Sequence, residues 1–148
     1  MAQVVAVNIS EKKGTVKKTV EKAMLIEDFG LEGDAHGGPG KRQVSLLSVE
    51  SVEKSKAQAK DQNRVKGICE GSFAENITTS GIELFTLPVG TKLKIGNAKL
   101  EISQIGKECH TGCEISKIVG KCIMPTEGVF AKVVVGGEIK AGDNIEIV

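Results

Sequence analysis

Short stretches of alternating or continuous apolar residues are spread along most of the chain. Val4–Ile9 is mostly apolar and rich in β-branched residues, which predicts a buried strand. Thr15–Met24 alternates more loosely and predicts a second strand, and Gln43–Ser48 predicts a third. The second half of the chain adds strand-like runs at Asn76–Thr79, Leu93–Ile95, Leu100–Ile105, Val129–Val135 and Asn144–Val148.

One segment has a helical pattern instead. Val49–Arg64 is rich in Lys, Glu, Gln and Ala, with its few apolar residues on one side, so we expect a mostly solvated helix. Ser48 is a suitable N-cap, and Glu50 in the first turn favours the helix dipole. The sequence therefore predicts a single long helix between two groups of strands.

Glycine marks the turns between these elements. The chain has 18 Gly and 3 Pro, which is typical of tight turns between short strands. We expect turns at Lys12–Gly14, Gly136–Gly137 and Gly142–Asp143, and loops at Leu31–Gly40 and Gly67–Gly71. Strands spaced by about 8–12 residues predict a small barrel or sandwich. The fold class is mainly β with a few helices (α+β), in one domain spanning residues 1–148, because no repeat or linker interrupts the chain.

The amino-acid composition limits which kinds of molecule the protein is expected to bind. The 20 basic and 19 acidic residues leave a net charge of +1, and aromatic residues make up 3% of the chain. Both argue against a nucleic-acid partner, which attracts a basic excess and often aromatic stacking. The N-terminus carries neither a signal-peptide pattern nor a membrane span, so we expect a cytoplasmic protein without a membrane partner. In that compartment the four cysteines favour free thiols or ligands over disulfides.

Two thiols and an imidazole are concentrated in Gly106–Cys113. Cys109 follows a predicted strand in a glycine-marked loop, a good position for exposing a reactive side chain. Lys107 and a protonated His110 favour its thiolate, whereas Glu108 disfavours it. Cys113 is an auxiliary thiol that could resolve an oxidised Cys109 or act as a second ligand. Alternatively, Cys109 and Cys113 are buried packing residues, as free cysteines often are.

A second polar group lies in the predicted glycine-rich loop. Asp34 and His36 fall within Gly33–Gly38, where open backbone amides suit an anion such as phosphate. Lys41 and Arg42 follow directly and could pair with phosphate or carboxylate. The alternative is an ordinary solvated turn.

Two further features are interpreted as structural and not functional. Glu75 and Asn76 are expected to form a turn with local hydrogen bonds. Cys69 and Cys122 are expected to be structural, because neither lies in a tight motif with a charged residue or a histidine.

Taken in order, several weak motifs resemble one known family, the MOSC domain (molybdenum cofactor sulfurase C-terminal domain), over nearly the whole chain. The motifs are Gly30–Gly38, Arg42–Leu47, Phe73–Thr79, Gln104–His110, Gly128–Val133 and Gly142–Asp143. The chain is similar to the short, stand-alone bacterial type. It departs from the family pattern at Glu108, where proline is common, and at Cys113, a thiol that many members lack.

The resemblance implies a small MOSC-type β-barrel with its site around one cysteine. Cys109 matches the family's characteristic cysteine, five residues after Gln104, which is proposed to carry a persulfide and which ligates molybdenum in related reductases. It also implies that the same pocket is lined by Asp34, His36, Arg42 and Asn76.

Three hypotheses follow. The favoured one is a molybdenum-cofactor-binding or sulfur-carrier domain of molybdenum cofactor metabolism, with Lys107 and His110 supporting the Cys109 thiolate and with Lys41, Arg42 and the Gly33–Gly38 amides binding the pterin phosphate of molybdopterin. One alternative is a small molybdenum-dependent reductase of N-hydroxylated compounds. The other is a non-catalytic β module stabilised by zinc.

The favoured hypothesis requires partners. No lysine motif for pyridoxal phosphate is present, so sulfur would come from a donor such as a cysteine desulfurase. The recipients would be molybdenum cofactor enzymes or biosynthesis proteins.

Overall fold

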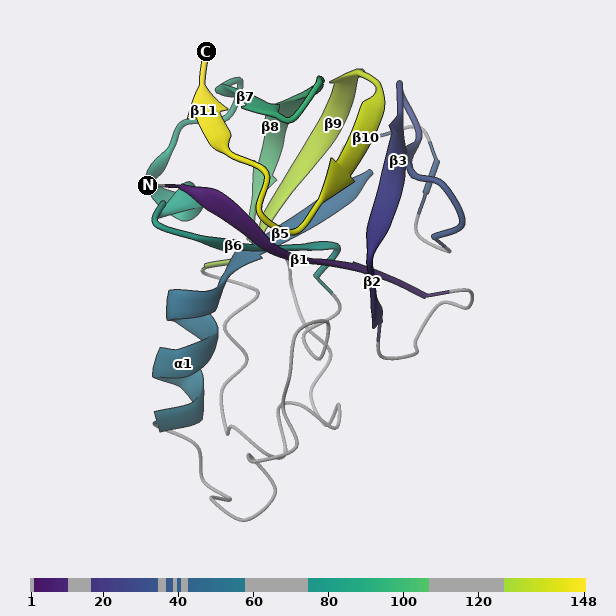
Figure 1. Ribbon diagram of the computed structural model, residues 1–148. Coiled ribbons are helices and arrows are strands. Elements are labelled where there is room, and N and C mark those ends of the chain that lie inside the picture. The colour runs from purple at the N-terminus through teal and green to yellow at the C-terminus, as the bar shows by residue number, and fades with distance from the viewer. Residues whose placement is uncertain are drawn as a thin grey trace.

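The computed structural model describes residues 2–10, 17–34, 37–38, 40, 43–57, 75–106 and 127–148. In this part of the chain, strands form a larger sheet of eight strands and a smaller one of three (Figure 1). The larger sheet has the order β11-β7-β8-β9-β5-β6-β1-β2, and the smaller has the order β10-β3-β4. The predicted class, mainly β with helix, is confirmed.

The elements are short, as the glycine content suggests. The larger sheet contains β1 (Gln3–Ile9), β2 (Lys18–Val20), β5 (Val44–Ser48), β6 (Ile77–Ser80), β7 (Lys92–Ile95), β8 (Ala98–Ile105), β9 (Val129–Val135) and β11 (Ile145–Ile147). The smaller sheet contains β3 (Lys22–Ile26), β4 (Gly30–Leu31) and β10 (Gly137–Lys140). The helices are α1 (Val49–Ala57) and the 3-10 turn η2 (Leu84–Thr86).

The middle of the larger sheet joins distant parts of the sequence. β5 lies between β6, to which it is parallel, and β9, to which it is antiparallel. β6 also pairs with β1 in antiparallel fashion. The helix α1 begins directly after β5 and points away from the sheets (Figure 1). The end of β1 and the beginnings of β5 and β6 therefore lie next to one another.

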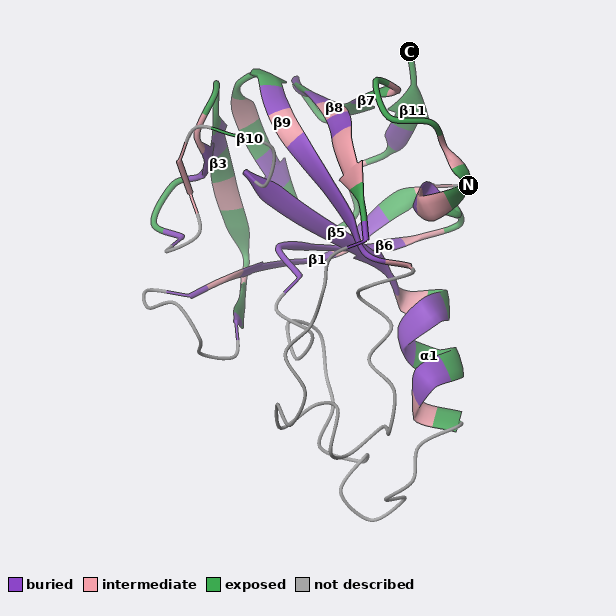
Figure 2. Ribbon diagram, turned by 180° about the vertical axis from the view of Figure 1, so that it is seen from behind, coloured by how far each residue is buried: buried purple, intermediate pink, exposed green. Residues whose placement is uncertain are grey.

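The hydrophobic core follows from the alternation of the strands. Leu93 and Ile95 of β7 are buried, whereas Lys92 and Lys94, which alternate with them, are exposed, as expected for a strand with one face in a core. Leu100 and Ile102 of β8 and Ala131 of β9 continue the same apolar face. β5 differs because all of its residues are buried, which agrees with its position inside the sheet (Figure 2).

The helix begins where the sequence indicates. The Ser51 amide donates to Ser48 Oγ at 3.1 Å, which makes Ser48 the side-chain cap of α1. Ser51, Val52 and Ser55 are the buried residues of the helix, so its inner face is narrow and largely polar. Residues 58–64 of the predicted helix and the predicted turn and loop at 12–14 and 67–71 lie outside the described residues.

Two boundaries were predicted wrongly. The single strand expected at Thr15–Met24 is two strands in its described part, because the chain changes sheet at Glu21: β2 pairs with β1, whereas β3 pairs with β10. The turn expected at Gly136–Gly137 is shorter, because Gly137 already begins β10. A Cβ at Gly136 would lie 2.7 Å from the Leu25 carbonyl oxygen, so glycine permits this close change of sheet. β4, β10 and η2 were not predicted.

The predicted closed barrel is not confirmed. An isolated bridge between Gln3 and Asn144 brings β1 towards the start of β11, supported by backbone hydrogen bonds between Val4 and Asp143 at 2.8 Å and between Ile145 and Ala2 at 3.0 Å. The described strands nevertheless form two sheets, neither of which closes on itself.

No helix in the described part of the chain is long and apolar enough to cross a membrane.

Candidate functional site

Two of the predicted site residues, Asp34 and Asn76, lie in the described part of the chain. The other candidates lie outside it: His36, Lys41, Arg42, Lys107, Cys109, His110 and Cys113. Cys69 and Cys122 lie outside it too. The site can therefore be built from the residues that surround Asp34 and Asn76.

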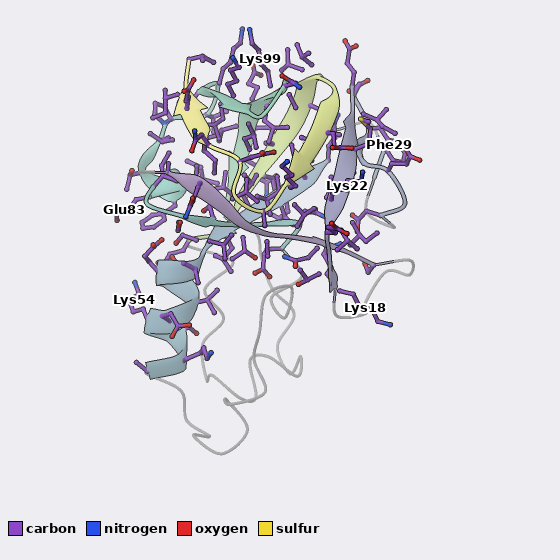
Figure 3. The ribbon with its side chains drawn as sticks, viewed as in Figure 1. Lys18, Lys22, Phe29, Lys54, Glu83 and Lys99 are labelled. Carbon is purple, nitrogen blue, oxygen red and sulfur yellow. The ribbon has the colours of Figure 1, made fainter. Side chains whose placement is uncertain are left out.

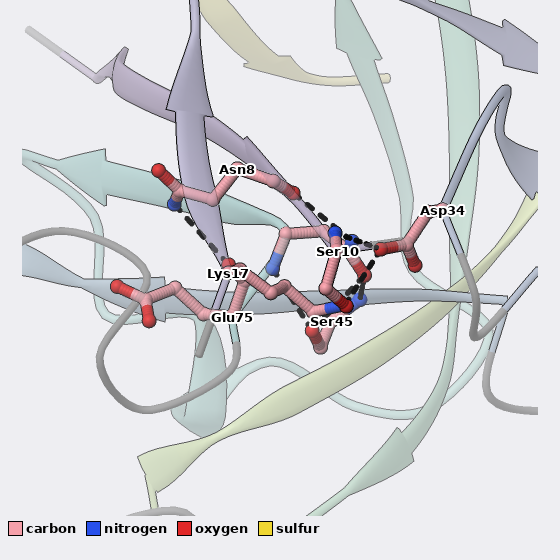
Figure 4. Close-up of polar contacts among 7 residues, drawn as sticks. Asn8, Ser10, Lys17, Asp34, Ser45 and Glu75 are labelled. Atoms are coloured by element: carbon pink, nitrogen blue, oxygen red, sulfur yellow. Dashed lines mark hydrogen bonds and ion pairs between the residues drawn. The ribbon is translucent and has the colours of Figure 1, made fainter. Parts of the chain in front are cut away.

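Asp34 is buried a few residues after β4 and holds an ion pair. Its Oδ1 lies 2.7 Å from Nζ of Lys17, and the exposed fractions of the two side chains are 0% and 1% (Figure 4). The same oxygen accepts the Ser10 backbone N–H at 3.0 Å. Lys17 Nζ also lies 3.3 Å from Ser10 Oγ. Three chain segments, at the end of β1, the start of β2 and the end of β4, thus meet at one carboxylate.

The surroundings of Asp34 favour its charged form. Burial by itself raises the pKa of Asp34, but hydrogen bonds from Lys17, the Ser10 amide and the Asn76 side chain lower it, as does the Lys17 charge. Their combined effect outweighs burial, and the pKa lies below the ordinary value of 3.8. Asp34 is therefore ionised at neutral pH although it is buried. The participation of Asn76 also shows that the two predicted site residues are neighbours.

Asn76 acts as an additional peptide unit where β6 begins. Its backbone N–H donates to the Ser45 carbonyl at 2.9 Å, and its carbonyl accepts the Asn8 N–H at 2.7 Å. The side chain repeats this pattern: Oδ1 accepts the Ser45 N–H at 2.9 Å, and Nδ2 donates to the Asn8 carbonyl at 3.2 Å. Asparagine suits this position because its amide carries both a donor and an acceptor, as a peptide does. These hydrogen bonds join Asn76 to residues on other strands, far away in sequence, instead of forming the local pattern expected from sequence.

Asn8 extends the hydrogen bonding away from Asn76. Its Nδ2 donates to the Glu75 carbonyl at 3.2 Å and to Thr78 Oγ1 at 3.1 Å. Thr78 Oγ1 in turn donates to Glu75 Oε2 at 2.9 Å. Thr19 Oγ1 donates to Asn8 Oδ1 at 2.7 Å. The Thr78–Glu75 hydrogen bond is local, but it joins two side chains, whereas hydrogen bonds to the backbone were expected.

These residues form a buried set that we call the polar cluster. Its members lie in β1, β5 and β6 or in the chain next to β1, β2, β4 and β6, and each is at most 6% exposed. They are Asn8, Ser10, Lys17, Asp34, Ser45, Glu75, Asn76 and Thr78. Figure 4 shows most of them around the crossing of these strands. Sequence reasoning missed Lys17, because it lies in the lysine-rich stretch Lys12–Lys18, where every lysine looks solvated.

The segment that leads towards Cys109 is described as far as Gly106. Gln104 Nε2 donates to the Gly106 carbonyl at 2.8 Å, and the Gly106 N–H donates to the Gly128 carbonyl at 2.7 Å. Gly106 has φ 76°, in the left-handed region that favours glycine. This agrees with the predicted sharp turn at the end of the strand. Gly106 directly follows β8, whose last residue Ile105 pairs with Val129 of β9.

The glutamine of the Arg42–Leu47 motif has a structural role. Gln43 is fully buried, and its Oε1 accepts the Val133 N–H at 2.9 Å. Its Nε2 donates to Asp28 Oδ1 at 2.8 Å. The side chain therefore holds β9 to the turn before β4, apart from the polar cluster.

A separate groove lies beside α1. Its volume is about 470 Å³, and it lies between the start of the helix and the segment around η2. Lys54 of α1 pairs with Glu127 at 3.1 Å, and Ser51 Oγ donates to the same carboxylate at 2.7 Å. Lys54 and Glu83, both in its lining, lie on the same side of the molecule in Figure 3. Asp34 and Asn76, the two predicted site residues within the described ranges, do not line this groove.

Among the described residues, no group of three or more His, Cys, Asp or Glu side chains is arranged to hold a metal ion. All four cysteines, which include the ligands of the zinc hypothesis, lie outside these residues. The amide, hydroxyl and carboxylate groups of the polar cluster are buried and form hydrogen bonds within the protein.

The MOSC domain model matches residues 32–146, and the chain belongs to the MOSC domain family. The match begins two residues before Asp34 and includes Asn76, Gln104 and the Cys109 segment. The family is associated in general with molybdenum-cofactor-related function. The resemblance inferred from the ordered motifs is therefore confirmed.

Solved structures support the same fold. YuaD from Bacillus subtilis has a TM-score of 0.80 at 20% identity, covering 99% of this chain and 96% of that one. YiiM from Escherichia coli has a TM-score of 0.73 at 20% identity, covering 100% of this chain and 70% of that one. YiiM from Geobacillus stearothermophilus has a TM-score of 0.70 at 17% identity, covering 100% and 75%. No curated protein matches the chain. At these identities the likeness concerns the fold alone.

Proposed function

We propose that this chain is a single-domain molybdenum-cofactor-binding or sulfur-carrier protein of molybdenum cofactor metabolism, acting in the cytoplasm. The observation that carries the proposal is the family match over residues 32–146, which contains every proposed site residue. The polar cluster supports it, because Asp34 and Asn76, far apart in sequence, are buried neighbours.

In this proposal the charge for cofactor binding comes from residues beyond the polar cluster. Lys17 and Asp34 neutralise each other, so the pair adds little attraction for an anion. Lys41, Arg42 and the Gly33–Gly38 amides would bind the pterin phosphate. His36 and Asn76 would line the same pocket. The cofactor, when bound, supplies the redox-active molybdenum.

Cys109 is the proposed reactive residue, as a persulfide carrier or a molybdenum ligand. As a carrier, its thiolate attacks the outer sulfur of a donor persulfide, such as that of a cysteine desulfurase. The new S–S bond forms at Cys109 as the donor's S–S bond breaks, and the donor leaves as a thiolate. Lys107 and His110 would favour the attacking thiolate. Cofactor enzymes or biosynthesis proteins would receive the sulfur.

The proposal is tested by purifying the protein from a host that makes the cofactor. Molybdenum, pterin and cysteine persulfide are measured per chain in the wild type, in Cys109→Ala and in Cys69→Ala as a matched control. We expect the wild type and Cys69→Ala to retain at least one of the three, and Cys109→Ala to lose most of its persulfide or molybdenum. Wild-type protein that holds none of them above Cys109→Ala contradicts the proposal.

The same preparation separates the alternatives. Turnover of N-hydroxylated compounds by the loaded protein with an artificial electron donor would favour the reductase. Stoichiometric zinc, with unfolding on chelation, would favour the zinc-stabilised module based on Cys109, Cys113 and Cys122.

A further inference from the structure

Lys17 is an unusual residue for a protein interior. It is 2% exposed, and its Nζ lies 2.7 Å from Asp34 Oδ1 and 3.3 Å from Ser10 Oγ. Lysine is almost never fully buried unless it is paired, because removing an ammonium from water is costly. Its burial together with Asp34 therefore calls for an explanation other than packing.

Stability alone does not provide that explanation. A buried ion pair can often be replaced by apolar residues of similar volume without loss of stability. Methionine is close to lysine in shape and would fill the same space in an apolar environment. The particular property that Lys17 adds is a directed charge, which fixes the position of its partner carboxylate.

The position of Asp34 matters because the glycine-rich segment of the proposed site begins there. The Gly37 N–H donates to the Asp34 carbonyl at 3.2 Å, and the Gly38 N–H donates to the Phe29 carbonyl at 2.7 Å. The Asp34 side chain is held by Lys17 and the Ser10 amide, which belong to the β1–β2 part of the larger sheet. The ion pair thus holds Asp34, the residue from which this segment begins, against the β1–β2 part of the larger sheet. Asp34 is far from Ser10 and Lys17 in sequence.

We infer that Lys17 is a positioning residue of the proposed cofactor site: it holds the Asp34 carboxylate in place and so fixes the position of Asp34, whose carbonyl accepts the Gly37 N–H. This inference rests on the proposed function, but its structural part can be measured without cofactor. The charge of Lys17 acts through Asp34, so a variant that keeps the charge keeps the site, even where it disturbs packing.

The experiment compares two substitutions with opposite properties. Lys17→Met keeps the volume and removes the charge, whereas Lys17→Arg keeps the charge and adds bulk. Lys54→Met is the matched control, because Lys54 also forms an ion pair but is 56% exposed. The double variant Lys17→Met/Asp34→Asn removes both charges of the pair, so no buried charge is left without a partner. It replaces Lys17→Met in the experiment if that single variant does not fold.

Two quantities are measured: hydrogen exchange of the Gly37 and Gly38 amides in cofactor-free protein, and molybdenum retained per folded chain. Lys17→Met is expected to speed exchange at both glycines about tenfold or more, while Gly90, whose N–H donates to the Ile102 carbonyl, is unchanged. Retained molybdenum falls about tenfold or more, as for other residues that orient a site indirectly. In the double variant, exchange at the two glycines should be at least about threefold faster, and retained molybdenum at least about threefold lower. A change of this size is on the order of the loss of one hydrogen bond. Lys17→Arg restores both quantities towards wild type, and Lys54→Met changes neither.

A packing role predicts the reverse order, with Lys17→Met close to wild type and Lys17→Arg defective, and this result overturns the inference. The inference is also overturned if the Gly37 and Gly38 amides exchange at the wild-type rate in both Lys17→Met and the double variant. Wild-type protein without molybdenum or pterin contradicts the proposed function instead, and the exchange measurement then still decides the role of Lys17.

Discussion

Two parts of the larger sheet are buried to the same extent but are built from different side chains. Where β7, β8 and β9 pair, the buried residues are apolar, with Leu93, Leu100 and Ala131 all at 0% exposure. Where β1, β5 and β6 meet, buried polar residues such as Asn8 and Asn76 accompany the apolar ones. The boundary between the apolar and the polar part lies where β5 pairs with β9, because β5 pairs with β6 on its other side.

Apolar and polar burial contribute differently to a folded protein. Apolar burial stabilises the fold without fixing any single atom, because the hydrophobic effect is non-directional. Buried polar groups gain little net stability, and they require defined partners at defined distances. A buried polar cluster inside a sheet therefore fixes the positions of its atoms more than it stabilises the protein. In this chain the polar part contains Asp34 and Asn76, the two residues of the proposed site that the structure describes.

Replacing Asp34 by asparagine should have the largest effect on stability. It leaves the Lys17 ammonium buried without its carboxylate, and breaking a buried pair in this way costs about 3–5 kcal/mol. Urea unfolding measures the change. Glu138→Gln is the control, because its pair with Lys22 is exposed and is worth about 1 kcal/mol or less. A loss from Asp34→Asn as small as that of the control would contradict the structural role of the pair.

Leu100→Ala tests the apolar part of the sheet. Leu100 is fully buried in β8, and such truncations cost about 2–5 kcal/mol through lost burial and the cavity left behind. We expect stability to fall while molybdenum retained per folded chain stays at the wild-type level. If Leu100→Ala loses molybdenum as strongly as Asp34→Asn does, the two parts of the sheet are not functionally distinct.

Asn76→Ala should have a smaller effect on stability. The substitution removes the partner of the Ser45 N–H and of the Asn8 carbonyl, and a buried group left unsatisfied costs about 1–3 kcal/mol. The loss should combine non-additively with Asp34→Asn, because the two side chains are neighbours. A double-mutant cycle by urea unfolding measures this coupling, and strict additivity would show that the polar cluster is not one unit.

A mild fall in pH gives the smallest expected effect. The pKa of Asp34 is lower in the folded protein than its ordinary value of 3.8. The stability that its charge contributes is therefore fully present above that value and is lost as pH falls through the lower folded pKa. The free-energy difference between wild type and Asp34→Asn should be constant from about pH 8 to pH 5 and shrink below the ordinary pKa. A difference that already shrinks near neutral pH would mean that the pKa of Asp34 is raised.

The apolar part of the fold was largely predictable from sequence, whereas the polar part was not. Alternation with period two marks β7 and β8 directly, and Ser48 marks the start of α1. The ordered motifs placed Asp34 and Asn76 in one pocket, and the structure makes them neighbours. These predictions depend on local patterns or on the order of motifs, which are both visible in a sequence.

The missed features depend on contacts between distant segments. Nothing in the sequence around Lys17 distinguishes it from the solvated Lys18 beside it, because its partner Asp34 is on another element. The change of sheet at Glu21 was missed because β3 finds its partner, β10, near the other end of the chain. Burial of a charge and exchange of strand partners are properties of tertiary pairing, which local periodicity does not record.

The place of β5 in the sheet has a consequence for the order of folding. Val44 of β5 pairs with Ala131 of β9, and β6 joins β1 over a similarly long stretch of chain. Non-local pairings of this kind slow folding, because long loops must close before any contact compensates for the lost chain entropy. During synthesis, β5 therefore has no neighbour on its β9 side until almost the whole chain has emerged. We expect the strand bordering the proposed site to become protected late in refolding, after the β7–β8 hairpin, whose residues are close in sequence.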